Sequence, residues 1–179
     1  RSTPKPSSAA SDVYKRQPTH GCVYINDVDI TQLSMEERSS FRRWHIGFIF
    51  QNFNLIPEMN VFENIVLPAK LMERNISKKE VMRIAEELEI EEKLLQNPMT
   101  LSGGQQQRVA IARAIYTHPT ILLGDELTGN LDSTTSISIM KFLKKMCKKY
   151  RQTMIIVTHD ERIAAMADRI IQMKDGRVV

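Results

Sequence analysis

Two short motifs contain the residue types best suited to chemistry on a phosphate group. The first is Leu101–Gln105 (LSGGQ), which runs directly into an apolar-periodic stretch. Ser102 is placed to cap a helix, and Gly103 and Gly104 leave the first backbone N–H groups uncovered by side chains. Because a helix N-terminus carries about half a positive charge, the motif predicts a site for an anion such as a polyphosphate. Taken alone, it could also be a loop that leads into a helix.

The second motif is Ile121–Glu126 (ILLGDE), an apolar strand that delivers two carboxylates at its C-terminal end. Ligands of open α/β sheets collect at that end. Asp125 is suited to hold Mg²⁺, directly or through water, and Glu126 to orient or deprotonate the water that attacks a γ-phosphate. On its own, this pair could be a solvated acidic turn. Its combination with a phosphate-binding helix start favours nucleotide hydrolysis.

Two more polar residues follow apolar, strand-like segments. His159 comes after Met154–Thr158, where it could donate to a γ-phosphate oxygen as charge develops. A lone histidine in such a loop is more often structural. Gln51 closes the segment Ile46–Phe50, and its neutral amide suits a place beside a metal ion and water. Both side chains are candidate members of the same site.

The helix and strand signals of the chain alternate, which predicts an α/β fold with a mostly parallel sheet. The expected helices begin at Ser34, Asn60 and Ser77 or span about 134–150 and 161–167. The expected strands lie at 22–25, 46–50, 120–123, 154–157 and 170–173. The segments 121–123 and 155–157 show no polar alternation, as expected for strands covered on both faces.

Length and composition restrict the remaining possibilities. The 179 residues, 42% of them hydrophobic, suffice for one domain with a sizeable core. The formal charge is +4, but residues 1–17 hold four basic residues and one acidic residue, so the rest is close to neutral and its charge indicates no nucleic-acid partner. No apolar run approaches the roughly 20 residues of a membrane span, and no secretory signal opens the chain. We expect a cytoplasmic protein.

Together these residues resemble the ATP-binding-cassette (ABC) ATPases. Leu101–Gln105 resembles their signature motif, and Ile121–Glu126 resembles their Walker B strand with its catalytic glutamate. Gly129–Asp132 is similar to their D-loop, His159 to their switch histidine and Gln51 to their Q-loop glutamine. The order and spacing of the motifs match the family from about residue 18 to the end of the chain.

The resemblance extends to a subgroup of the family. The run Arg42–Leu55 and the TGNLD form of the D-loop resemble ATPases of lipoprotein release, macrolide export and cell division. This implies a P-loop NTPase-like ABC fold with a helical subdomain at about 54–100, and ATP hydrolysis that powers a membrane transport complex. It also implies a head-to-tail dimer, in which ATP and Mg²⁺ lie between one subunit's P-loop and the other's signature helix.

The resemblance also implies roles for single residues. Glu126 and His159 would be catalytic, and Asp125 with Gln51 would hold Mg²⁺. The residues implied in ATP binding are Ser102, Gly103, Gly104, Gln105, Gln51 and Asp132. The implied partners are an ABC permease and a second ATPase subunit, at the inner face of the cell membrane. The candidate permease contacts, which could equally be ordinary core residues, are Phe53, Leu55, Ile56 and Pro57.

The chain departs from the family most clearly in lacking a P-loop motif, G-x-x-x-x-G-K-[ST], because none of its seven glycines is followed by lysine. In the family this loop precedes the segment that resembles Pro18–Gly21. We therefore expect 18–179 to be an N-terminally truncated cassette that binds nucleotide weakly or not at all by itself. Residues 1–17, rich in proline and serine, would be a disordered or non-native lead-in. Upstream coding DNA without a P-loop in frame would contradict this.

Two smaller departures lie beside the catalytic glutamate. Leu127 stands where the family usually has proline, and Gly124 where it usually has alanine. Each change adds backbone freedom and is expected to loosen the turn that aims Glu126. Neither removes a catalytic group.

Two other classes of function fit parts of the pattern. A soluble ABC ATPase of DNA repair or chromosome maintenance would insert a long coiled coil between Q-loop and signature, but only residues 52–100 separate them here. A degenerate cassette that only dimerises would explain the absent P-loop, whereas the retained Asp125, Glu126 and His159 argue against decay. ATPase turnover by the full-length reading frame would separate a motor from a degenerate cassette.

Overall fold

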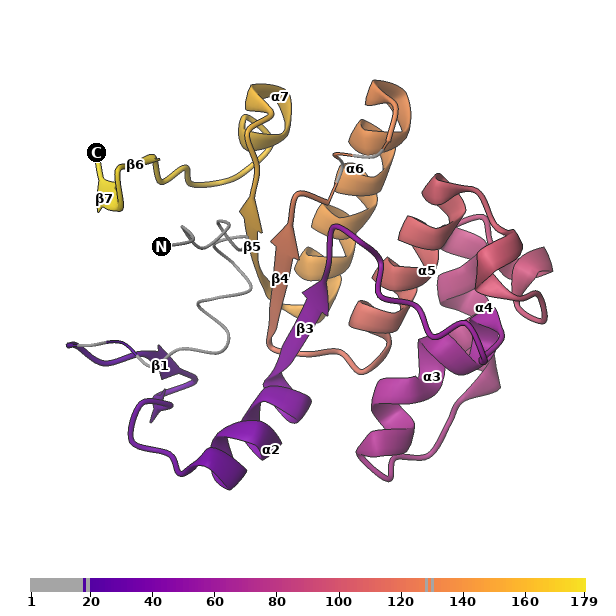
Figure 1. The fold of residues 1–179 in the computed structure, drawn as a ribbon, viewed down its shortest axis with the longest axis horizontal. Coiled ribbons are helices and arrows are strands. Elements are labelled where there is room, and N and C mark those ends of the chain that lie inside the picture. Colours follow the sequence, from indigo (N-terminus) through magenta and orange to yellow (C-terminus); the bar gives the residue numbers. More distant parts are fainter. Residues whose placement is uncertain (1–17, 19, 128, 130) are drawn as a thin grey trace, which may run out of the picture.

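A parallel three-stranded sheet lies at the centre of the computed structural model, which describes residues 18, 20–127, 129 and 131–179. Its strands are β3 (Ile46–Ile49), β4 (Ile121–Asp125) and β5 (Thr153–Val157), in the order β3-β4-β5. Both pairings are parallel, so the C-terminal ends of the three strands meet at one edge of the sheet (Figure 1). The expected α/β fold with a parallel sheet is confirmed. The expected lead-in at 1–17 and Asn130 of the D-loop lie outside the described residues.

The described helices are α2 (Met35–His45), α3 (Val61–Leu71), α4 (Lys78–Glu87), α5 (Gly103–Tyr116), α6 (Ser133–Tyr150) and the short α7 (Glu161–Ala164), with 3₁₀ turns at Glu91–Lys93 and Pro98–Thr100. Figure 1 shows α5 and α6 against the sheet, with α3 and α4 beyond α5. None of the described helices is long and apolar enough to cross a membrane.

Local sequence signals start the first of these helices. The side chains of Ser34 and Asn60 each accept a hydrogen bond from the N–H three residues on, and Glu37 and Glu63 accept one from the N–H of the capping residue. Ser77 caps α4 in a simpler way, through the N–H of Glu80. Such caps are worth about 1 kcal/mol each. The three predicted helix starts are therefore confirmed.

Two short hairpins flank the sheet. β1 (Tyr24–Ile25) pairs antiparallel with β2 (Val28–Asp29), and β6 (Met173–Lys174) pairs antiparallel with β7 (Arg177–Val178). The first turn, Asn26-Asp27, has positive φ at both residues, the conformation of a tight hairpin turn. The sequence predicted the first strand and its turn, but not the strand that returns from it.

The prediction of a strand at 170–173 is wrong for all but its last residue. Strand structure begins at Met173, and the preceding Ile170 and Ile171 are exposed. The predicted helix 161–167 is also shorter, since α7 ends at Ala164. Short apolar runs do not form a strand unless a neighbouring strand supplies backbone hydrogen bonds, and among the described strands none pairs with 170–172.

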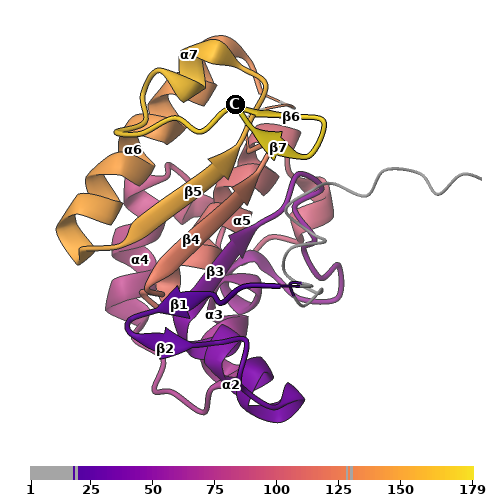
Figure 2. The same ribbon diagram turned by 90° about the vertical axis from the view of Figure 1, so that its left-hand side faces the viewer.

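The two faces of the sheet are covered unequally. Along β5, Met154 and Ile156 pack against the core, whereas Ile155 and Val157 on the other face are 52% and 40% exposed. Figure 2 looks onto this second face, with the strands in front of the helices. The expectation that 155–157 is covered on both faces is therefore wrong for the described residues, because an apolar run does not itself reveal whether a second layer packs on it.

The core joins the helical stretch to the sheet. Among its fully buried side chains are Ile65 of α3, Ile84 of α4, Ile111 of α5 and Leu122 of β4, all in one hydrophobic cluster. The stretch of about 54–100 contains α3, α4 and both 3₁₀ turns, so its helical character is as expected. Its separation as a subdomain stays a prediction, because the same cluster runs through it and the sheet.

Candidate functional site

The start of α5 is open to solvent and locally stabilised. The Ser102 hydroxyl accepts a hydrogen bond from the Gln105 N–H at 3.3 Å, and the Gln105 side-chain oxygen accepts one from the Ser102 N–H at 3.0 Å. Ser102 and Gly103 are exposed, and Gly104 is half-buried. The predicted cap is confirmed, and the helix N-terminus is accessible to an anion.

A hollow of about 280 Å³ lies between the start of α5 and the start of α6. It is lined by Ser102, Gly104, Gln105, Arg108, Leu131, Asp132 and Thr135. The Leu131 side chain lies 3.5 Å from the position that a Cβ on Gly104 would occupy. A side chain at position 104 would therefore contact Leu131 within the hollow. Five residues that the sequence assigned to the signature motif and D-loop thus line one hollow.

Asp132 has a structural task beside that hollow. One carboxylate oxygen accepts hydrogen bonds from the N–H groups of Thr134 and Thr135, at 3.0 and 2.9 Å, and so caps α6. Bonds from the Thr135 side chain and backbone lower the pKa of Asp132. The carboxylate is therefore engaged with α6, which accounts for this residue without a nucleotide.

The acid pair lies at the other side of the site, where β4 ends. Asp125 is the last residue of β4 and is buried. Glu126 has φ of +49°, a left-handed conformation that costs a non-glycine residue about 1–2 kcal/mol. Two backbone hydrogen bonds hold it, from the Glu126 N–H to the Val157 carbonyl at 3.0 Å and from the Gly129 N–H to the Glu126 carbonyl at 3.1 Å.

His159 contacts the second of these acids directly. Its Nδ1 lies 2.8 Å from Oε1 of Glu126, at the C-terminal edge of the neighbouring strand. This hydrogen bond and the charge of Glu126, with a smaller effect of Asp160, raise the pKa of His159. The imidazole is mostly exposed, with 83% of its side chain accessible, so it can donate to a ligand that arrives from solvent.

Gln51 completes this group from the third strand. Its Nε2 lies 3.7 Å from the position that a Cβ on Gly129 would occupy, and Cβ of Glu126 lies 4.0 Å from the same position. The structure thus brings Gln51, Glu126 and His159 together at the ends of β3, β4 and β5. We call these three residues and Asp125 the strand-end group.

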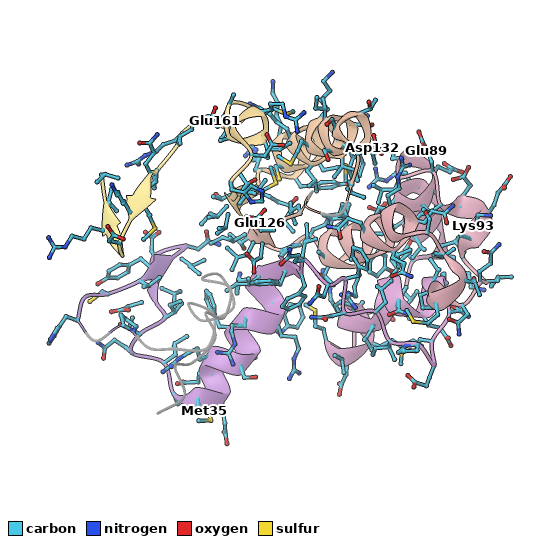
Figure 3. The ribbon with its side chains drawn as sticks, turned by 45° about the horizontal axis from the view of Figure 1, so that its top comes forward. Met35, Glu89, Lys93, Glu126, Asp132 and Glu161 are labelled. Atoms are coloured by element: carbon cyan, nitrogen blue, oxygen red, sulfur yellow. The ribbon has the colours of Figure 1, made fainter. Side chains whose placement is uncertain are left out.

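The strand-end group and the α5 hollow are separate in one chain. None of the four residues of that group lines the hollow. Figure 3 labels Glu126 and Asp132, which stand at the two ends of the connection from β4 to α6. One chain therefore presents two separate groups of candidate site residues, which we call half-sites.

The strand-end group is a partial fit for Mg²⁺. Mg²⁺ is usually bound by one or two carboxylates together with substrate phosphates and water. Asp125 supplies a carboxylate and Gln51 an amide, and among the described residues no group of three or more His, Cys, Asp or Glu could hold a metal. The remaining ligands of the ion would have to come from phosphate and water.

Sequence reasoning missed Arg113, which holds the loop after Gln51. Its guanidinium donates to the carbonyls of Phe53 and Asn54, at 2.6 Å each, and both of these residues have positive φ. Burial lowers the pKa of Arg113. The available signal was a lone cation inside the apolar run Val109–Ala114.

Asn64 has a similar role in the first turn of α3. It is fully buried, accepts from the Ile56 N–H, and donates to the carbonyls of Ile56, Met59 and Asn60. These bonds fix the segment 56–60. The available sequence signal was an asparagine directly before the apolar run Ile65–Leu67.

Comparison with known proteins places this geometry in a family. A family model described as "ABC transporter" matches residues 13–129. The chain is 44% identical over 168 residues to the uncharacterized ABC transporter ATP-binding protein MJ0796 of Methanocaldococcus jannaschii, covering 90% of this chain and 72% of that one. It is 43% identical over 164 residues to the lipoprotein-releasing system ATP-binding protein LolD of Syntrophotalea carbinolica, with coverage of 90% and 72%.

A longer relative and a solved structure agree. The macrolide export ATP-binding/permease protein MacB of Rhodopirellula baltica is 39% identical over 165 residues, and the chain spans 24% of its length. The dimeric post-hydrolysis structure of MJ0796 bound to ADP and Pi superposes with a TM-score of 0.83 at 41% identity, covering 92% of this chain and 74% of that one.

Proposed function

The chain belongs to the ABC transporter family, and we propose that its two half-sites work in a head-to-tail pair of ATPase subunits. The protein functions as an ATP-binding and ATP-hydrolysing subunit of an ABC-type membrane transport complex, whereas the 179-residue chain alone, which has no P-loop motif, is expected to be inactive. The observation that carries the proposal is the strand-end group, in which Glu126 contacts His159 and both adjoin the end of β4. Such a group can position water and stabilise developing charge on a phosphate.

Within the strand-end group, Glu126 is the residue that orients or deprotonates the attacking water. Glu126 stands in a left-handed turn, and its carboxylate lies against the imidazole of His159. His159, whose pKa is raised, keeps a proton available for donation to the γ-phosphate. Gln51 adjoins the same turn and is suited to sense whether the nucleotide is present.

Asp125 and Gln51 are the residues that would hold Mg²⁺. Mg²⁺ would neutralise charge on the β- and γ-phosphates when bound. Asp125 is buried at the last position of β4, so its backbone position is fixed by the strand. This prearrangement supports its role, since a fixed ligand loses little freedom on binding.

The α5 hollow would bind the triphosphate of the opposite subunit. Ser102 and Gly103 are exposed at the start of α5, and the helix dipole favours an anion there. The strand-end residues do not line this hollow, which is what a shared site between two subunits requires. The solved structures of MJ0796 are described as dimeric, in agreement with this arrangement.

A membrane permease is the proposed partner of the segment after Gln51. The relatives named for macrolide export and lipoprotein release act in membrane systems. In this chain Pro57 and Glu58 are exposed, Leu55 and Ile56 are half-buried, and Asn64 fixes the segment from beneath. A rigid, partly apolar loop suits the transfer of motion to a partner at the cytoplasmic face of the membrane.

Two alternatives make different predictions. A chromosome-maintenance ATPase would need a coiled coil between α3 and α5, but that stretch folds into α4 and two 3₁₀ turns against the common core. A degenerate cassette would have no turnover, whatever its partners. Turnover is therefore the decisive measurement.

The test uses two samples. The 179-residue chain has no P-loop motif and is expected to show no micromolar affinity for Mg-ATP by calorimetry. A chimera in which the P-loop segment of the Syntrophotalea LolD relative precedes residue 18, called the P-loop chimera below, is expected to bind and hydrolyse ATP. Binding without hydrolysis by the chimera would favour the degenerate cassette, and micromolar binding by the chain alone would contradict the division into half-sites.

A further inference from the structure

Gly124 and Leu127 occupy one shared space beside the catalytic turn. A Cβ built on Gly124 would lie 2.7 Å from Cγ and Cδ1 of Leu127 and 2.8 Å from its Cδ2. Cβ atoms do not approach other carbons that closely, so the Leu127 side chain fills the volume that any larger residue at 124 would need. Leu127 is 3% exposed and belongs to the main hydrophobic cluster, so it has little room to move aside.

Leu127 also anchors the turn that carries Glu126. The Glu126 N–H donates to the carbonyl of Val157, and the Glu126 carbonyl accepts from the N–H of Gly129. These bonds tie the turn to β5 and close it on itself. Leu127 directly follows Glu126, and its buried side chain packs over Gly124 of β4. This contact holds the turn against β4. A left-handed residue persists only where its surroundings determine it, and here they do so on both sides.

We infer that Leu127 is a positioning residue for Glu126, and that position 124 is glycine because Leu127 lies across it. The inference depends on the proposed function only for the catalytic role of Glu126. The contact between 124 and 127 stands without it. The family usually has alanine and proline at these positions. Glycine at 124 and leucine at 127 were each expected to loosen the turn. Together they hold it through their mutual contact, in place of the usual alanine and proline.

His159 offers a direct readout of where the Glu126 carboxylate lies. Its Nδ1 is 2.8 Å from Oε1 of Glu126, and the charged groups that face it are Glu126 and Asp160. Glu126→Gln removes the charge and sets the reference pKa of His159, nearer its ordinary 6.5. The titration is followed by NMR of the imidazole protons in the 179-residue chain and needs no nucleotide.

The first variant is Leu127→Ala. It empties the space over Gly124, and the pKa of His159 is expected to fall most of the way to the Glu126→Gln value. Leu143→Ala is the matched control, because Leu143 is an equally buried leucine of α6, outside the contacts of Gly124. It should lower the melting temperature by a similar amount and leave the pKa of His159 unchanged. Leu127→Met, which keeps the volume, should preserve the pKa.

The second measurement is a double-mutant cycle. Gly124→Ala should lower the melting temperature by several degrees while Leu127 is present, and should have little effect in the Leu127→Ala background, because the added methyl then fills a vacant space. Equal effects in both backgrounds would overturn the shared-space argument. A folded Leu127→Ala chain with an unchanged His159 pKa would overturn the positioning role. Neither of these two outcomes would contradict the ATPase assignment. Conversely, an inactive P-loop chimera would contradict the ATPase assignment but not the contact between Leu127 and Gly124.

Discussion

The start of α5 and the strand-end group reach their geometry by different routes. The first is built from five consecutive residues and one capping box, with Ser102 and Gln105 satisfying each other's backbone N–H groups. The second is assembled from three strands that are distant in the sequence, and its members meet only because β3, β4 and β5 are parallel and adjacent. The first half-site therefore depends on local conformation, and the second on the packing of the whole sheet.

This difference predicts which properties a substitution in each half-site should change. A change at the start of α5 should act on ligand binding and leave the fold intact, since its caps are exposed. A change near the end of β4 should affect orientation and stability together, because Asp125 and Leu127 are buried. The comparison can be tested by substitutions on each side.

The largest effect is expected for Glu126→Gln in the P-loop chimera. Loss of a general base typically lowers turnover about 10²–10⁴-fold, and Mg-ATP affinity should be unchanged within about twofold. Steady-state phosphate release measures the first quantity and calorimetry the second. Glu161→Gln, an exposed acid at the start of α7, is the matched control and should keep full turnover. A twofold loss for Glu126→Gln would place the base elsewhere.

The next effect is expected for Ser102→Arg in the same chimera. The bulky cation closes the hollow, so turnover should fall at least about 10²-fold, as for the loss of an electrostatic stabiliser. The melting temperature should fall by only about 2–4 °C, because Ser102 is exposed and its loss removes one helix cap worth about 1 kcal/mol. Met99→Arg, exposed on the preceding 3₁₀ turn, is the control. Retained activity would mean that the hollow takes no phosphate.

A moderate effect is expected for Arg113→Met in the 179-residue chain. Two carbonyls in a left-handed turn lose their donors, which should cost about 1–3 kcal/mol in urea unfolding. Hydrogen exchange should quicken at 51–56. Arg113→Lys keeps the charge but cannot donate to both carbonyls with the guanidinium's paired N–H groups. It should recover part of the lost free energy of unfolding. Arg169→Met, at an exposed arginine, should change little. An unaltered exchange rate would show that other contacts hold the Gln51 loop.

The smallest effect is a pH dependence of stability. The pKa of His159 is raised in the folded chain, so the contribution of its contact with Glu126 is fully present below the unfolded value of 6.5. It is lost as the pH rises through the raised value. Urea unfolding of the chain and of Glu126→Gln should therefore differ at about pH 6 and converge at about pH 9. A difference that grew with pH would contradict the contact.

Local signals made much of the helical structure predictable from sequence. The caps at Ser34, Asn60, Ser77 and Ser102 lie next to the helices that they start, so a few residues suffice to identify them. The members of the strand-end group were also identifiable, because each follows an apolar segment. Their meeting at one edge followed from the expected parallel sheet.

Contacts between distant segments were not predictable. Arg113 is 59 residues from the Asn54 carbonyl it holds, and nothing near either residue indicates the pairing. The contact of Leu127 with Gly124 is closer, but it depends on a left-handed turn at Glu126 that residue types do not suggest. The exposure of Ile155 escaped prediction for a similar reason, since it is set by what packs on a sheet and not by the strand itself.

That uncovered sheet face bears on how the purified protein behaves in solution. Ile155 and Val157 project from a strand that, among the described strands, has a neighbour on one side only. Such a strand can template pairing between molecules, so light scattering should rise with concentration and on warming. The substitution Ile155→Lys would introduce charge repulsion there and should keep concentrated samples clear for longer.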